Sequence, residues 1–203
     1  MDRETIAFYD AEAAAYADTM ARDWPDGPPM LARFAARLAP GGRVLDLGCG
    51  PGQDAARLAA MGFAVDAMDA SEGLAAEARR RHGIAVRVAS FDALDAEALY
   101  DGVWAAFSLL HDSRAALPRH LARIARALKP GGALYLGLKE GEGEARDSLG
   151  RRYFYVRAAE IAARLAEAGF AAPEIGRDEG TGMAGTREPL LHVLTLRAGE
   201  TDA

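Results

Sequence analysis

A glycine-rich turn headed by a carboxylate is the part of this sequence best suited to bind a ligand. Residues 46–52, with the sequence DLGCGPG, follow a short apolar run and precede an amphipathic stretch. Gly48 and Gly50 allow tight backbone geometry and let a ligand approach the main chain closely. The carboxylate of Asp46 would repel a pyrophosphate, but it would attract a ligand that carries ammonium and sulfonium groups. The simpler alternative is that the Asp46 side chain only caps the turn, with Cys49 as a small residue that fits it.

The turn differs from the dinucleotide-binding pattern G-x-G-x-x-G in two ways. Its third glycine, Gly52, comes one residue early, and Gln53 stands where dinucleotide folds have glycine or alanine. Together with the charge of Asp46, these differences disfavour a dinucleotide-dependent oxidoreductase.

Two further carboxylates follow apolar runs. Asp69 ends the second run, where its carboxylate could accept hydrogen bonds from both hydroxyls of a ribose. It could instead be only a helix-entry residue, although Ser71 is the better N-cap. Asp92 follows Phe91 after the third run and could accept a hydrogen bond from an adenine amino group. The alternative for Asp92 is an ordinary acidic helix start.

His111 is the candidate general base. It ends the segment SLLH at 108–111, after the fourth apolar run, and an imidazole there could take a proton from an oxygen or nitrogen nucleophile. Capping of the following turn is the alternative of equal weight. The remaining histidines, His82, His120 and His192, lack partners at metal-ligand spacing, so no metal site is predicted.

Residues 139–155 combine charged, glycine and aromatic residues. We expect a lid in which Arg151 and Arg152 grip an anionic group while Tyr153 and Tyr155 pack on a substrate. Since adjacent residues of a strand point to opposite faces, at most one of the two arginines should reach the site. A solvated loop followed by core aromatic residues is the alternative.

These residues need a framework that brings the ends of several apolar runs together. Apolar runs alternate with amphipathic stretches, which predicts parallel strands connected by helices. Right-handed crossovers then favour a doubly wound sheet, whose ligands bind at the carboxyl ends of the strands. The predicted strands are 44–47, 64–68, 84–89, 102–107, 133–138, 173–179 and 190–197, and the predicted helices are 5–20, 53–61, 72–81, 114–128 and 158–168.

The last two predicted strands are joined by a glycine-rich loop without a helix, so the last strand should be antiparallel to its partner. The predicted fold is an α/β, Rossmann-like, doubly wound and mostly parallel seven-stranded sheet with an antiparallel last strand and helices on both faces. We expect a single domain over 1–203. It comprises an N-terminal helical cap at 1–40 with a Pro/Gly-rich turn at 25–29, a cofactor-binding core at 41–138, and a substrate-side lid with the C-terminal strands at 139–203.

In this framework, residues 44–52 resemble the cofactor loop of the class I S-adenosylmethionine-dependent methyltransferases. Residues 65–71 are similar to the ribose-binding segment of that family, 90–92 to its adenine-binding segment, and 128–132 to the turn before its fifth strand. The resemblance covers about residues 5–138 in order. It implies S-adenosyl-L-methionine as cofactor and S-adenosyl-L-homocysteine as product. The implied cofactor contacts are Tyr16, Asp46, Gly48, Cys49, Gly50, Asp54, Asp69, Ala70, Phe91, Asp92 and Ser108.

The reaction that the resemblance implies is methyl transfer to an oxygen, nitrogen or sulfur atom of a small molecule. Tyr9 and Tyr16 are similar in placement to family residues that close over the cofactor, and Tyr9 is also expected to contact the substrate. The protein mainly has to align donor and acceptor, and a base is needed only for acceptors that carry a proton. The alternatives are a nucleic-acid or protein methyltransferase and a non-catalytic, cofactor-binding regulatory module.

Composition narrows the partners. The 203 residues carry a formal charge of −6, which gives little affinity for nucleic acid. The single cysteine fits a reducing compartment, and no apolar run approaches the ~20 residues that span a bilayer. No signal peptide is recognisable at the polar N-terminus. We therefore expect a cytoplasmic monomer or homodimer with no membrane partner.

Overall fold

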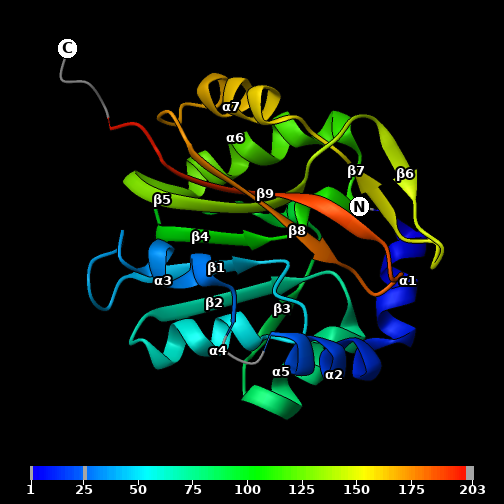
Figure 1. Cartoon of the computed structure of the whole chain (residues 1–203). Helices are drawn as coiled ribbons and strands as arrows, with labels where there is room; N and C mark the ends of the chain where they lie inside the picture. Colours follow the sequence, from blue (N-terminus) through cyan, green and yellow to red (C-terminus); the bar gives the residue numbers. More distant parts are fainter. Residues whose placement is uncertain (1, 25–26, 200–203) are drawn as a thin grey trace.

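The computed structural model describes residues 2–24 and 27–199, and its centre is a seven-stranded sheet with the strand order β3-β2-β1-β4-β5-β9-β8 (Figure 1). Neighbouring strands are parallel except for β9, which is antiparallel to both β5 and β8. The predicted fold class is confirmed, including the antiparallel last strand. The strands of this sheet are β1 (Arg43–Leu47), β2 (Ala64–Asp69), β3 (Val86–Val88), β4 (Tyr100–Ala106), β5 (Leu128–Lys139), β8 (Glu174–Thr181) and β9 (Arg187–Leu196).

Helices cover both faces of the sheet. In Figure 1, α6 and α7 lie above it and α4 and α5 below it. One apolar cluster joins Leu121 of α6 and Leu165 of α7 to the sheet, and another joins Phe34 of α3 and Leu58 of α4. Within the described residues, no helix is long and apolar enough to cross a membrane. The helices are α1 (Arg3–Ala11), α2 (Ala13–Asp23), α3 (Pro29–Ala35), α4 (Gln53–Ala60), α5 (Glu72–His82), α6 (Leu117–Ala127) and α7 (Ala158–Glu167), with short 3-10 turns η1 (Phe91–Ala93), η2 (Leu109–His111) and η3 (Arg114–Ala116).

The pleat of the sheet places several polar side chains on one face. Asp46 of β1 pairs with Trp104 of β4, which pairs with Tyr135 of β5. Paired residues share a face, and so do residues an even number apart along one strand. Trp104 and Tyr135 belong to the cluster on the side of α3 and α4. Asp46 and, four residues after Tyr135, Lys139 therefore point to that side at the carboxyl ends of their strands.

The N-terminal segment differs from the single predicted helix over 5–20. α1 ends at Ala11 and α2 begins at Ala13. The carboxylate of Asp10 accepts hydrogen bonds from Ser71 Oγ at 2.6 Å and from Gly73 N at 3.0 Å, at the start of α5. This tertiary contact, which no local pattern reveals, ties down the chain where the two helices meet. Part of the turn expected at 25–29, namely residues 25 and 26, lies outside the described residues.

The segment expected as a lid contains a small β-hairpin. β6 (Glu144–Arg146) pairs antiparallel with β7 (Arg152–Phe154), separately from the main sheet. The hairpin is attached to the N-terminus, since Arg146 pairs with Asp2 and the backbone N–H of Arg152 donates to Thr5 Oγ1 at 2.9 Å. Three-residue strands are too short to show a period in the sequence.

Candidate active site

The glycine-rich turn connects β1 to α4 at the carboxyl edge of the sheet. Gly48 has a φ of 78°, and a Cβ atom there would lie 2.2 Å from the Cβ of Ser108. Only glycine fits, because both the backbone conformation and the close contact exclude a side chain. The backbone N–H groups of Gly48 and Cys49 donate to the carbonyl of Met68 at 2.7 and 3.1 Å. The loop is therefore held against the end of β2.

Asp46 lies beneath this loop with an unpaired oxygen. The residue is 2% exposed, and its Oδ2 atom has no hydrogen-bond partner among the described residues. Burial, reinforced by the charges of Asp54 and Asp69, raises the pKa of Asp46 well above its usual range. A buried carboxylate without a matching donor is unfavourable. This position is thus suited to a ligand that brings a cation or a donor.

Asp69 ends β2 and braces the same loop. Its Oδ2 accepts a hydrogen bond from Gly50 N at 2.8 Å, and its Oδ1 accepts one from Ser71 N at 2.9 Å. Burial raises the pKa of Asp69, although these backbone donors act in the opposite direction. Ser71 is the N-cap of α5 and accepts from Leu74 N. Ser71 rather than Asp69 therefore caps α5, and the Asp69 carboxylate lies beside the loop.

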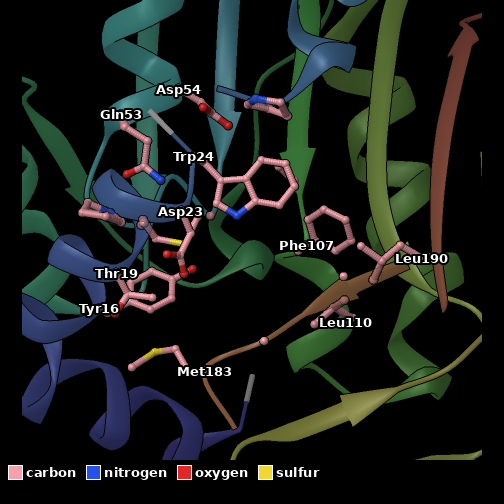
Figure 2. A pocket seen from close by; sticks show the side chains of 18 of the residues that line it. Tyr16, Thr19, Asp23, Trp24, Gln53, Asp54, Phe107, Leu110, Met183 and Leu190 are labelled. Atoms are coloured by element: carbon pink, nitrogen blue, oxygen red, sulfur yellow. The ribbon is translucent and has the colours of Figure 1, made fainter. Parts of the chain in front are cut away.

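Asp54, in the first turn of α4, links the loop to its surroundings. Its carboxylate accepts from Trp104 Nε1 at 3.0 Å and pairs with Arg57 at 2.8 Å. Arg57 in turn donates to the carbonyl of Trp24 at 2.7 Å. Figure 2 shows Asp54 and Trp24 close together at one side of a cavity.

Two adjoining cavities lie at this edge of the sheet. The larger, of about 200 Å³, runs from Asp46 and Asp54 to side chains of β5, β7 and the β8–β9 hairpin (Figure 2). The smaller, of about 60 Å³, is lined by Asp69 and Ala70, among others. A ligand could thus occupy both sides of the glycine loop. The residues common to the two cavities are Tyr9, Tyr16, Gly48, Gly50, Ala106, Phe107 and His111.

Tyr9 of α1 and Tyr16 of α2 line both cavities on the side of the N-terminal helices. Their rings pack edge to face with centroids 5.1 Å apart. Burial raises the pKa of both hydroxyls, so both tyrosines are neutral at physiological pH. The structure thus brings both predicted tyrosines to the site.

His111 is buried in η2 and has a partner on each ring nitrogen. Its Nε2 lies 3.0 Å from the hydroxyl of Tyr9, and its Nδ1 lies 2.8 Å from the carbonyl oxygen of Arg152. Burial lowers the pKa of His111 to about 4. The imidazole is therefore neutral near pH 7, as a general base must be.

The two adjacent arginines point in different directions. Arg151 is 3% exposed, lines the larger cavity, and donates through Nε and Nη2 to Asp147 at 2.9 and 2.7 Å and through Nη1 to Tyr9 at 3.2 Å. Arg152 pairs with Glu144 at 2.6 Å and is not among the residues that line either cavity. Only one of the pair reaches the site, as expected from strand alternation.

Lys139 is a functional candidate that the sequence analysis did not single out. It is 8% exposed at the end of β5, where its Nζ lies 3.3 Å from the ring centroid of Tyr153 and pairs with Glu188 of β9. Lys139, Tyr153 and Glu188 line the larger cavity. Tyr155 lies behind them and donates to Glu188 at 3.0 Å. An ammonium group buried against a ring and one carboxylate is a polar anchor at the far end of this cavity.

Two of the predicted cofactor contacts lie outside both cavities. Asp92 pairs with Arg119 at 2.9 Å, and Phe91 is buried against His120, so neither residue lines a cavity. Their contact with an adenine ring stays a prediction. Ser108 donates to the carbonyl of Leu47 at 2.6 Å and borders the smaller cavity.

One wall of the larger cavity was not predicted from the sequence. Thr181 and Met183 at the β8–β9 turn line this cavity. His192 of β9 and Tyr135 of β5 line it as well, and His192 Nδ1 lies 2.8 Å from the hydroxyl of Tyr135. The only available signal was the glycine-rich loop between the last two strands, which marks a turn but not its position over a site.

Comparison with known proteins agrees with this geometry. A family described as a methyltransferase domain matches residues 44–132. A trans-aconitate 2-methyltransferase of Methylobacterium nodulans is 37% identical over 148 residues, which cover 70% of this chain and 54% of the relative. The match thus spans about half the length of that relative.

Solved structures share the whole fold. The 1,6-didemethyltoxoflavin-N1-methyltransferase of Burkholderia thailandensis, with bound 1,6-didemethyltoxoflavin and S-adenosylhomocysteine, is 25% identical and superposes with a TM-score of 0.70 over 98% of this chain and 91% of its own. An S-adenosylmethionine-dependent methyltransferase of Methanosarcina mazei, 20% identical, has a TM-score of 0.69 over 86% of this chain and 100% of its own, which shows the fold alone.

The chain therefore belongs to the class I S-adenosylmethionine-dependent methyltransferases. The prediction of S-adenosylmethionine as the cofactor is confirmed with it. The residues present fit this cofactor. A cationic amino acid moiety suits the unpaired oxygen of Asp46. Because a side chain at residue 48 would collide with Ser108, this residue is a glycine, which leaves bare backbone beside Asp46. Within 2–24 and 27–199, no group of three or more His, Cys, Asp or Glu side chains could hold a metal ion.

Proposed function

We propose that this protein transfers a methyl group from S-adenosylmethionine to an oxygen, nitrogen or sulfur atom of a small molecule that carries an anionic group. The observation that supports the proposal is the continuity of the larger cavity. It joins the unpaired Oδ2 atom of Asp46, beneath the glycine loop, to a chamber that contains Arg151 and Lys139. A donor and an acceptor could therefore meet in one cavity.

The donor end would be held by residues of this chain with distinct tasks. Asp46 would bind the ammonium group of the cofactor, Asp69 its ribose hydroxyls, and Gly48 and Gly50 would allow its approach to the backbone. Bound S-adenosylmethionine supplies an electrophilic methyl group. Tyr16, which packs beside Gly50, would shield that region from water.

The acceptor end would be held by two cations. Arg151 and Lys139 line the chamber and both contact the ring of Tyr153, with Arg151 Cζ at 5.5 Å and Lys139 Nζ at 3.3 Å from its centroid. Each is partly neutralised by one carboxylate, Asp147 or Glu188, and still has N–H donors without a partner among the described residues. An acceptor carboxylate or phosphate could bind these donors. The name of the Methylobacterium relative, which specifies an aconitate substrate, is compatible with this chemistry.

The experiment has a binding stage and a turnover stage. S-adenosylhomocysteine should raise the melting temperature, because a ligand at about 100 times its Kd stabilises the native state by roughly 2.7 kcal/mol. NAD should not. Transfer of labelled methyl to a pooled metabolite extract should then yield a labelled small molecule. Stabilisation by NAD alone, or label found only in protein or nucleic acid, would contradict the proposal.

A further inference from the structure

A chain of hydrogen bonds joins Arg151, Tyr9 of the N-terminal helix α1, His111 and the carbonyl of Arg152. Arg151 Nη1 lies 3.2 Å from the hydroxyl of Tyr9, that hydroxyl lies 3.0 Å from His111 Nε2, and His111 Nδ1 lies 2.8 Å from the carbonyl oxygen of Arg152. Tyr9 and His111 line both cavities, and their rings pack edge to face at 5.4 Å.

The direction of each bond follows from chemistry. A carbonyl oxygen only accepts, so His111 must carry its proton on Nδ1. The imidazole is neutral, which leaves Nε2 as a bare acceptor, and the hydroxyl of Tyr9 must donate to it. Arg151 can only donate, so the Tyr9 oxygen accepts from it. The chain therefore runs from Arg151 through Tyr9 and His111 to the carbonyl of Arg152.

This direction makes His111 Nε2 unavailable to an acceptor molecule, because Tyr9 occupies it. The phenolic oxygen of Tyr9, by contrast, has a further lone pair. It also lies beside the guanidinium of Arg151, which stabilises negative charge that develops on the oxygen. Asp147 favours a positive charge on His111, whereas Arg151 and Lys139 oppose it.

We infer that the base of the reaction is a Tyr9–His111 pair, in which Tyr9 is the residue that meets the acceptor; this rests on the proposed methyl transfer. As the acceptor atom forms its bond to the methyl carbon, its proton moves to the Tyr9 oxygen and the Tyr9 proton moves to His111 Nε2. The electron pair of the broken X–H bond stays on the acceptor atom, and that of the broken S–C bond stays on sulfur. Arg152, through its carbonyl, is a positioning residue that selects the His111 tautomer.

The first test needs no acceptor. Nitrogen NMR of histidine-labelled protein distinguishes protonated from bare ring nitrogens, and His111 is assigned by its loss in His111→Gln. We expect Nδ1 to be protonated, and Tyr9→Phe to shift the Nε2 resonance while leaving the tautomer unchanged. Tyr16→Phe, which removes a hydroxyl from the adjacent ring, should leave both resonances in place. A proton on Nε2, or an Nε2 signal that ignores Tyr9→Phe, would overturn the inference.

The second test uses the acceptor identified by labelled-methyl transfer. Tyr9→Phe keeps the ring contacts, so it should lower kcat about 10²- to 10⁴-fold, the usual contribution of general base catalysis, while KM for the acceptor changes only a few-fold. An unchanged kcat overturns the pair. Absence of methyl transfer by the wild-type protein, with the expected NMR tautomer, instead overturns the proposed function.

Discussion

The Oδ2 atom of Asp69 lies 2.8 Å from the backbone nitrogen of Gly50. One carboxylate thus holds in place the loop beside which a cofactor would bind. The second oxygen of Asp69 is bonded to the start of α5 through Ser71 N. The residue therefore connects β2, the loop and the helix, so a substitution at this position should affect both ligand binding and the shape of the loop.

Asp69→Ala should weaken the binding of S-adenosylhomocysteine by about 1.5–3 kcal/mol, the range for a hydrogen bond to a charged group. It should also lower stability, because backbone N–H groups such as those of Gly50 and Ser71 lose their partner. Asp101→Ala is the matched control, since Asp101 also accepts from a backbone N–H, that of Arg43, but lies at the opposite end of its strand. Calorimetry and urea unfolding separate the effects. Equal affinity losses in both variants would show that only stability is affected.

Asp46→Asn should change stability and binding in opposite directions. The unfolded carboxyl group titrates near 3.9, and its pKa in the folded protein is higher, so the wild-type free energy of unfolding falls as the pH rises from about 4 through the folded pKa. The asparagine variant lacks this loss and should be the more stable protein at pH 7 without ligand. Its affinity for S-adenosylhomocysteine should fall by about 1.5–3 kcal/mol. A variant that is both less stable and unchanged in affinity would refute the assignment of Asp46 to the ligand.

Arg151→Lys and Arg152→Lys should behave differently although the residues are adjacent. Lysine cannot reproduce the paired N–H donors of Arg151 toward Asp147 and Tyr9, so KM for the acceptor should rise roughly 10-fold or more, as expected for the loss of a charge-assisted hydrogen bond. Arg152→Lys should be nearly silent, because that side chain pairs with Glu144 outside the two cavities. Cofactor affinity should be constant in both. Similar KM values in the two variants would place Arg151 outside acceptor recognition.

Gly48→Ala should destabilise the protein more than Gly41→Ala. The two glycines have φ values of 78° and 74°, so the conformational cost of about 1–2 kcal/mol is shared. A methyl group at residue 48 would also collide with Ser108, whereas nothing lies within 4 Å at residue 41. Overpacking adds about 1–3 kcal/mol. Urea unfolding measures the difference, and equal losses would mean that Ser108 moves aside at little cost.

Much of the fold and of the donor end was predictable because both depend on local patterns. Short apolar runs that form buried strands and a glycine turn that must adopt positive φ are visible in sequence, and so the positions of Asp46 and Asp69 at neighbouring strand ends follow. Tyr9 and His111 were each predicted to lie at the site, Tyr9 from its placement in the family and His111 from its position after the fourth predicted strand. The contact between their side chains was not predicted.

The acceptor end was less predictable because it depends on contacts between distant segments. Lys139 is an ordinary strand-end residue until β9 brings Glu188 beside it. The same holds for Met183, which reaches the cavity only because β9 inserts between β5 and β8. The prediction that Asp92 contacts an adenine ring rested on its position after the third predicted strand and on the resemblance of residues 90–92 to an adenine-binding segment. Neither pattern reveals that its carboxylate pairs with Arg119.

The insertion of β9 between β5 and β8 has a consequence for how such a protein can diversify. The donor-side lining, from Asp46 to Arg57, belongs to the stretch matched by the methyltransferase family, whereas Lys139, Arg151 and the β8–β9 turn lie outside it. The β6–β7 and β8–β9 hairpins could therefore be exchanged for those of a relative while the donor loop is left intact. Under the proposed function, such grafts should alter acceptor preference while the donor loop keeps its sequence.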